Sequence, residues 1–251
     1  MAVALIGGLL IQAATNLYND GADSDLGNDG ADRLGPPRSA ANGIFTAAQV
    51  KRMAVTLFFL SALAGLYLVY VGGVAILLLD ALSILSGWGY SGGPWPIAYT
   101  PFGEIFVIAF FGLGAVGGTC WLAGGFVNTV TILAGVAIGA FASAVLLVNN
   151  LRDVKCDSRA GRRTLAIVIG EKWSRWIYIA FMLIPFLALF LMSGIAPHGT
   201  LWLAYASLPL SLYQCRRFIL EPQGRMLNGV LKRTAQTQLA FGCLLSVGLI
   251  L

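Results

Sequence analysis

The sequence predicts an all-α, polytopic membrane protein, and three observations lead to this fold class. Of the 251 residues, 58% are hydrophobic and only 11% are charged, whereas soluble domains carry about 25% charged residues. The mean hydropathy is +0.80, and most of the charged residues gather in a few loops between apolar stretches. Such a chain lacks the polar surface that a soluble globule needs. The composition therefore excludes a disordered chain, a fibrous repeat and a soluble enzyme.

Eight apolar stretches are long enough to cross a membrane, which takes about 17–25 residues. These predicted spans are 2–18, 53–71, 72–87, 104–122, 126–148, 174–193, 200–215 and 235–251. Together they predict a transmembrane helical bundle that forms a single domain over residues 1–251.

Local features justify the individual spans. The first has no positively charged residues before it, so we interpret it as a span and not as a signal peptide. The apolar run from Met53 to Ser86 is too long for one span, and Gly72-Gly73 divides it because glycine permits a tight reversal. The last span begins among the polar residues Gln236 and Gln238, which favours a start further along the chain.

The distribution of basic residues supports this number of spans. With eight spans, the loops at 19–52, 88–103, 149–173 and 216–234 lie on one face of the membrane, and all 16 Lys and Arg residues fall in or beside them. Basic residues mark cytoplasmic loops, so we expect these loops to be cytoplasmic. The net charge of +5 follows from this bias and does not indicate nucleic acid binding.

Two clusters of acidic residues follow apolar spans and lie on the same predicted face. Residues spaced by three or four positions share one face of a helix. The spacing holds for two sets, Asn16, Asp20 and Asp23, and Asn149, Asp153 and Asp157. Two carboxylate stripes at helix ends can point into one cavity, and a hard divalent cation such as Mg²⁺ would relieve their repulsion.

Basic residues accompany both acidic clusters. Arg33 and Arg38 follow the first cluster, and the second contains Arg152, Lys155 and Arg162. Guanidinium and ammonium groups bind phosphate oxygens, and Mg²⁺ is usually held by a few carboxylates together with substrate phosphates. The combination predicts a diphosphate site, and a diphosphate at a membrane indicates an isoprenoid or lipid-linked substrate.

These motifs resemble a known family. NLYNDGADSDLGNDGADRLGPPR (16–38) is similar to the first aspartate motif of UbiA-superfamily intramembrane prenyltransferases, and NNLRDVKCDSRAGRRTLAIVIGEKWSR (149–175) is similar to the second. SGGPWPIAYTPFGEIFVIAFFG (91–112) and LKRT (231–234) resemble the middle loop and the segment before the last span. Within the superfamily, the motifs look most like the branch that prenylates 1,4-dihydroxy-2-naphthoate in menaquinone synthesis.

The resemblance implies a Mg²⁺-dependent enzyme of the bacterial plasma (inner) membrane, with cytoplasmic aspartate loops. Its substrates would be a polyprenyl diphosphate, lying among the spans beside membrane lipid, and an aromatic acceptor. Carried onto this chain, the metal-binding and catalytic residues are Asp20, Asp23, Asp153 and Asp157. The substrate-binding residues are Asn16, Asn19, Arg33, Arg38, Tyr99, Asn149, Asn150, Arg152, Lys155 and Arg162. The family usually has nine helices, so the sequence predicts that the opening helix is absent here.

Three alternative functions would use similar residues, and only the third of them is also prenyl transfer. A CDP-alcohol phosphotransferase needs its aspartates within one short motif, whereas here the two clusters are over a hundred residues apart. A cation transporter or another non-enzymatic cation-binding membrane protein would also use aspartates, but transporters tend to hold ionisable groups near the bilayer midplane. A prenyltransferase for 4-hydroxybenzoate or homogentisate would use the same diphosphate site.

Overall fold

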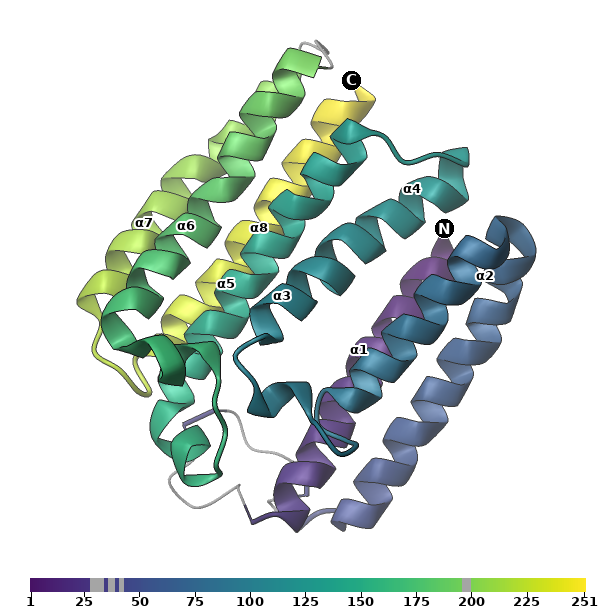
Figure 1. Cartoon of the computed structure of the whole chain (residues 1–251). Coiled ribbons are helices and arrows are strands. Elements are labelled where there is room, and N and C mark those ends of the chain that lie inside the picture. The colour runs from purple at the N-terminus through teal and green to yellow at the C-terminus, as the bar shows by residue number, and fades with distance from the viewer. Residues whose placement is uncertain (28–33, 36–38, 41–42, 196–199) are drawn as a thin grey trace. The chain divides into compact units, whose positions relative to one another are not determined.

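The computed structural model describes residues 1–27, 34–35, 39–40, 43–195 and 200–251. In this part of the chain every regular element is a helix (Figure 1), which confirms the all-α fold class. The elements are α1 (Ala2–Asp25), α2 (Ala47–Gly89), the 3₁₀ turn η1 (Ile97–Tyr99), α3 (Gly103–Val107), the π-helical η2 (Ile108–Gly114), α4 (Ala115–Gly124), α5 (Thr129–Arg159), α6 (Leu165–Ile195), the 3₁₀ helix η3 (Leu201–Ser207), α7 (Leu208–Leu220) and α8 (Leu227–Ile250).

Five described helical stretches are long and apolar enough to cross a membrane. They are α1, α2, the continuous stretch Gly103–Gly124, α5 and α6. They cover the first six predicted spans, except that α5 begins at Thr129 and the fifth span was predicted to begin at 126. The last two predicted spans correspond to η3 with α7 and to α8, which are not among these five. The total of eight crossings therefore stays a prediction.

The described residues divide into two compact units. Unit 1 is drawn from Met1–Pro101, Gly118–Phe126 and Lys155–Thr164, and unit 2 from Phe102–Gly117, Val127–Val154 and Leu165–Leu251. The division passes through α4 and α5, so it does not cut the chain into two successive segments. The single domain over 1–251 stays a prediction, and the units are described separately below.

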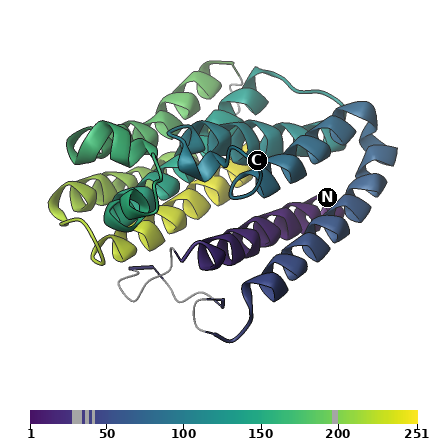
Figure 2. The same ribbon diagram turned by 60° about the horizontal axis from the view of Figure 1, so that its bottom comes forward.

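In unit 1, α2 is a helical hairpin with a break at Gly73. This residue has φ +71° and ψ −158°, a conformation that essentially only glycine adopts. Gly65 in the first arm lies against the carboxylate of Asp80 in the second, and Gly87 lies against the ring of Phe58. Both pairs are centred between Gly72 and Gly73, so the arms are antiparallel, as Figures 1 and 2 show. The predicted division of the long apolar run is confirmed.

The start of α2 packs against the polar end of α1. Thr46 and Gln49 form a capping box, in which the Thr46 hydroxyl accepts from the Gln49 amide and the Gln49 side chain accepts from the Thr46 amide. A Cβ at Gly21 would lie 3.0 Å from the carbonyl oxygen of Ala47. Glycine at this position therefore lets α2 begin directly beside the aspartates of α1.

In unit 2, aromatic rings join α5, α6 and α8. The ring centroids of Phe141, Phe186 and Phe241 lie 5.3–6.2 Å apart. The π-helical η2 packs on α5 through glycines, because a Cβ at Gly139 would lie 2.9 Å from the Cα of Ile108. Gly135 and Gly139 form a GxxxG pattern, which lets membrane helices approach closely.

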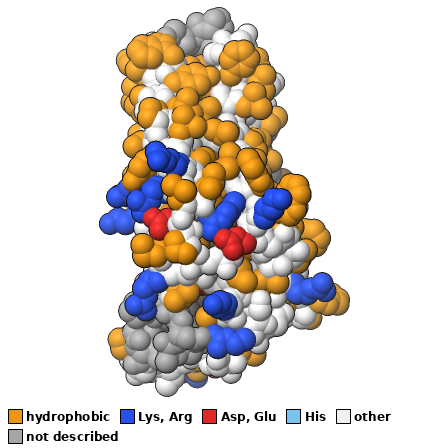
Figure 3. All heavy atoms as spheres, turned by 90° about the vertical axis from the view of Figure 1, so that its left-hand side faces the viewer, with side chains coloured by type: hydrophobic (Ala, Val, Ile, Leu, Met, Phe, Trp, Pro, Cys, Tyr) orange, Lys and Arg blue, Asp and Glu red, His pale blue; other side chains and the backbone are white. Residues whose placement is uncertain are grey.

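One end of unit 2 is basic. Figure 3 shows Lys and Arg side chains gathered on one part of the face that carries α6 and α7, while hydrophobic side chains cover the part above it. Arg175, near the start of α6, donates to the carbonyl oxygens of Phe218 and Glu221 at the end of α7. The start of α6 and the end of α7 therefore lie at the same end of the unit, as the parity of the predicted loops requires.

Candidate active site

The first aspartate motif lies on the last turns of α1, in unit 1. The helix continues to Asp25, so Asn16, Asp20 and Asp23 share one helical face as predicted. Asp20 and Asp23 are buried, with exposed fractions of 6% and 4%, whereas Asn16 is exposed. The Asp20 Oδ2 accepts a hydrogen bond of 3.0 Å from the backbone amide of Ser39, which ties the following loop to the motif.

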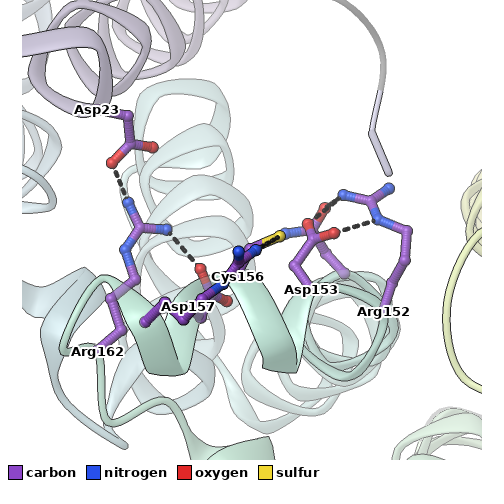
Figure 4. A network of polar contacts seen from close by, with 8 residues as sticks. Asp23, Arg152, Asp153, Cys156, Asp157 and Arg162 are labelled. Carbon is purple, nitrogen blue, oxygen red and sulfur yellow. Dashed lines mark hydrogen bonds and ion pairs between the residues drawn. The ribbon is translucent and has the colours of Figure 1, made fainter. Parts of the chain in front are cut away.

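Arg162 joins the two aspartate motifs within unit 1. Its Nη2 forms an ion pair with the Oδ1 of Asp23, and its Nη1 donates to the Oδ1 of Asp157 at 3.0 Å (Figure 4). Asp23 and Arg162 are 139 positions apart in the chain. The guanidinium also lies over the ring of Tyr99, 5.4 Å from its centroid, a cation–π geometry.

The ion pairs control the charge of the arginine. Burial by itself would lower the pKa of Arg162, but the carboxylates of Asp23 and Asp157 outweigh that effect and raise the pKa above its ordinary value. The side chain of Arg162 is 12% exposed. The site therefore holds a permanent, largely buried cation between the two carboxylates.

The loop after α5 places Arg162. The helix ends at Arg159, and Gly161 takes a φ of +74°, which favours glycine. The backbone amide of Arg162 donates to the carbonyl oxygen of Asp157 at 2.9 Å, and the amide of Arg163 donates to the carbonyl oxygen of Tyr99 at 3.3 Å. The turn thus directs the guanidinium back toward the helix end that carries Asp157.

A second polar set belongs to unit 2 and lies on the preceding turns of α5. The buried Arg152 donates to both carboxylate oxygens of Asp153, at 2.9 and 2.5 Å. It also donates to the Asn149 Oδ1 at 2.7 Å and to the Asn228 Oδ1 at 2.8 Å. Arg152 therefore orients the predicted site residues Asn149 and Asp153. Asn228 was missed by sequence reasoning, although it lies three residues before the LKRT segment.

Asn150 points to a different partner. Its Nδ2 donates to the Oε1 of Glu104 at 3.0 Å, and both side chains are buried. The Ser143 hydroxyl donates to the carbonyl oxygen of Glu104 at 2.8 Å. Glu104 stands in the first turn of α3 and was also missed, although an acidic residue opening an apolar span is itself a signal of a polar role.

The remaining predicted residues are exposed, half-buried or outside the described part of the chain. Lys155 is exposed, and Asn19 is half-buried at the end of α1. Arg33 and Arg38 lie outside the described residues, so the structure says nothing of their contacts. Asp25, beside the first motif, is exposed and forms an ion pair of 2.5 Å with Lys51.

The oxygen ligands near α1 fit the chemistry of Mg²⁺. Asn19 Oδ1 and Asp20 Oδ1 are buried and accept no hydrogen bond from any described residue, a costly state for a polar atom. Carboxylate and amide oxygens are suitable ligands for this cation. Among the described residues, no group of three or more His, Cys, Asp and Glu side chains is already gathered for a metal, and Arg162 binds two of the expected ligands.

Comparisons with known proteins place the chain in a family. A sequence model of the UbiA prenyltransferase family matches residues 1–226. A protein of Escherichia coli (strain K12) named 1,4-dihydroxy-2-naphthoate octaprenyltransferase is 33% identical, over 99% of this chain and 83% of its own length. A protein of the same name from Mycobacterium tuberculosis is 34% identical, over 96% of this chain and 80% of its own length.

Two solved structures share the fold. One is a UbiA homolog from Archaeoglobus fulgidus bound to DMAPP and Mg²⁺, with a TM-score of 0.66 and 14% identity, over 98% of this chain and 87% of the other. The second, described as digeranylgeranylglyceryl phosphate synthase, has a TM-score of 0.65 and 16% identity, over 98% and 84%. From its apolar helices, its fold and its family match, the chain is an integral membrane protein that belongs to the UbiA prenyltransferase family.

Proposed function

We propose that this enzyme transfers a polyprenyl group from a polyprenyl diphosphate to 1,4-dihydroxy-2-naphthoate, a step of menaquinone synthesis. The observation that carries the proposal is the pair of contacts of Arg162, which bring one carboxylate of each aspartate motif to the same guanidinium. The names of the relatives at 33% and 34% identity support the choice of acceptor.

The diphosphate end of the substrate would bind at the two aspartate motifs. Asp20, Asp23, Asp153 and Asp157 would hold Mg²⁺, assisted by the amide oxygens of Asn16, Asn19 and Asn149. Bound Mg²⁺ supplies positive charge that stabilises the departing diphosphate. Arg162 would add donors for phosphate oxygens, and Arg152 would keep Asp153 and Asn149 oriented through the contacts at 2.5–2.9 Å.

The reaction replaces a carbon–oxygen bond by a carbon–carbon bond. The allylic C–O bond of the prenyl diphosphate breaks, and its electrons leave with the diphosphate, where basic groups stabilise the growing charge. The electron-rich ring of the acceptor captures the allylic cation. Loss of the ring carboxylate as CO₂ returns the electrons of its carbon–carbon bond to the ring and leaves the prenylated 1,4-diol, which is the reduced form of demethylmenaquinone. Apolar surroundings are needed throughout, because water would otherwise capture the cation.

We further propose that the enzyme lies in the bacterial inner membrane with both aspartate motifs on the cytoplasmic side. All 16 basic residues lie in or beside the loops of that predicted face. A soluble diphosphate product would then be released into the cytoplasm.

A direct test uses membranes that contain the chain. They are incubated with Mg²⁺ and a polyprenyl diphosphate, together with equal amounts of 1,4-dihydroxy-2-naphthoate, 4-hydroxybenzoate and homogentisate, and products are identified by mass. We expect prenylated dihydroxynaphthoate that has lost CO₂. A different prenylated acceptor would correct the substrate, whereas the absence of any prenylated product would contradict prenyl transfer.

A matched pair of variants tests the site. We expect Asp153→Asn to abolish turnover while the protein still inserts in the membrane, because the variant loses one carboxylate expected to bind metal. Asp25→Asn should keep activity, since Asp25 is exposed and pairs with Lys51. Near-normal turnover by the Asp153 variant would remove this residue from the metal site.

A further inference from the structure

We propose that Arg162 is an internal cation that occupies the metal position between the two aspartate motifs and leaves it when Mg²⁺ and diphosphate bind together. The proposal rests on the proposed function, because it takes a diphosphate as the ligand. It assigns Arg162 two successive sets of partners, first the carboxylates and then the phosphate oxygens.

The argument starts from the atoms that Arg162 occupies. Its two terminal nitrogens contact the Oδ1 of Asp23 and the Oδ1 of Asp157, one oxygen from each motif (Figure 4). These are oxygens that a cation shared by the motifs would need. A guanidinium at hydrogen-bond distance and a divalent cation cannot use the same lone pairs, and their charges repel. Binding of Mg²⁺ therefore requires these two contacts to break.

The surroundings of the guanidinium allow it to move to a new partner. Its Nε is buried and has no hydrogen-bond partner among the described residues, so one donor is already unsatisfied. The ring of Tyr99, 5.4 Å below the guanidinium, presents an apolar face over which the group can shift without losing its cation–π contact. A phosphate group offers the same paired acceptors as the carboxylates, in a geometry that guanidinium matches.

The exchange has a thermodynamic consequence. Mg²⁺ alone must displace Arg162 without offering it a new anion, so it binds weakly. Diphosphate provides that anion, so the two ligands bind with positive coupling, which is reciprocal. Arg162 therefore weakens the binding of metal alone and strengthens the binding of diphosphate. A residue that only braces the fold would not produce effects of opposite sign.

The test compares Arg162→Gln with Arg159→Gln. Arg159 is exposed and lies on the last turn of α5, three residues before Arg162, and its variant carries the same loss of charge. Binding of Mg²⁺ alone, and of inorganic diphosphate at saturating Mg²⁺, is measured on detergent-purified full chain by calorimetry. For Arg162→Gln we expect Mg²⁺ alone to bind about 10-fold more tightly and diphosphate about 10-fold more weakly. Arg159→Gln should change neither by more than about 2-fold.

A stability measurement provides a second readout. Arg162→Gln removes the cation that Asp23 and Asp157 share, so it should lower the melting temperature without metal, and Mg²⁺ alone should restore it. If that variant does not fold, Arg162→Lys retains the charge but not the two-pronged geometry, and it should show the same two changes in weaker form. Unchanged or weaker binding of Mg²⁺ alone in the variant that folds would overturn the proposal. Both readouts are independent of turnover. If the binding changes are as expected but the prenyl transfer assay gives no product, the proposed reaction is refuted and the role of Arg162 is not.

Discussion

Asp23→Asn tests how much a buried ion pair contributes to stability, and an exposed pair on the same turn of α1 provides the comparison. The side chains of Asp23 and Arg162 are 5% and 12% exposed, and removing one partner of a buried pair costs about 3–5 kcal/mol. Arg162 keeps Asp157 at 3.0 Å, so we expect the lower end, about 3 kcal/mol. In a chain of this size that corresponds to a fall in melting temperature of roughly 6–12 °C.

The matched control is Asp25→Asn, two residues further along α1. The side chains of Asp25 and Lys51 are 52% and 29% exposed, and pairs of this kind contribute about 0–1 kcal/mol. Both variants are purified in detergent without Mg²⁺, and their unfolding is followed by intrinsic fluorescence. A melting temperature for Asp23→Asn equal to that of Asp25→Asn would refute the reasoning, because it would mean that burial does not decide the strength of these pairs.

Two further predictions concern glycines, one at a helix contact and one at a helix break. Gly139→Ala should destabilise unit 2, because its methyl would meet the backbone of η2 at 2.9–3.2 Å and overpacking costs about 1–3 kcal/mol. The control is Gly117→Ala, whose methyl would have no atom within 4 Å, so this variant should be as stable as the parent chain or more stable. Comparing their melting temperatures cancels the shared gain in helix propensity, and a Gly139 variant at least as stable as the Gly117 variant would contradict the close packing. Gly73→Ala should cost about 1–3 kcal/mol through its φ of +71° alone, since no atom lies within 4 Å of the added methyl. Gly8→Ala, in α1 with equal space, should not be destabilised, and equal stability of these two variants would place Gly73 in a conformation that any residue can adopt.

Much of the fold could be predicted from the sequence, because local hydropathy determines where the spans lie and local glycines determine where helices break. The Gly72-Gly73 pair predicted the reversal inside α2, where Gly73 breaks the helix. The spacing of Asn16, Asp20 and Asp23 predicted that α1 continues beyond its apolar part, and it ends at Asp25. The π-helical η2 could not be predicted, since it is associated with contacts to glycines of α5 far along the chain.

The partners of the site residues were not predictable from spacing. Asn149 and Asn150 were both expected to bind substrate, but neighbours on a helix point about 100° apart. Asn149 therefore accepts from Arg152, whereas Asn150 donates to Glu104. The contact between Asp23 and Arg162 joins residues 139 positions apart, and a single sequence carries no signal for such a pairing.

The charge balance of the site explains where a divalent cation is most needed. Asp153 already forms a two-oxygen pair with the buried Arg152, so this pair is close to neutral. In unit 1, the guanidinium of Arg162 forms ion pairs with the buried carboxylates of Asp23 and Asp157, and Asp20 is a third buried carboxylate. The buried Oδ1 of Asp20 accepts no hydrogen bond from any described residue, so it is a further carboxylate atom that a cation could use once Arg162 has left Asp23 and Asp157. We therefore expect Mg²⁺ to bind tightly only together with diphosphate, which gives Arg162 its new partner.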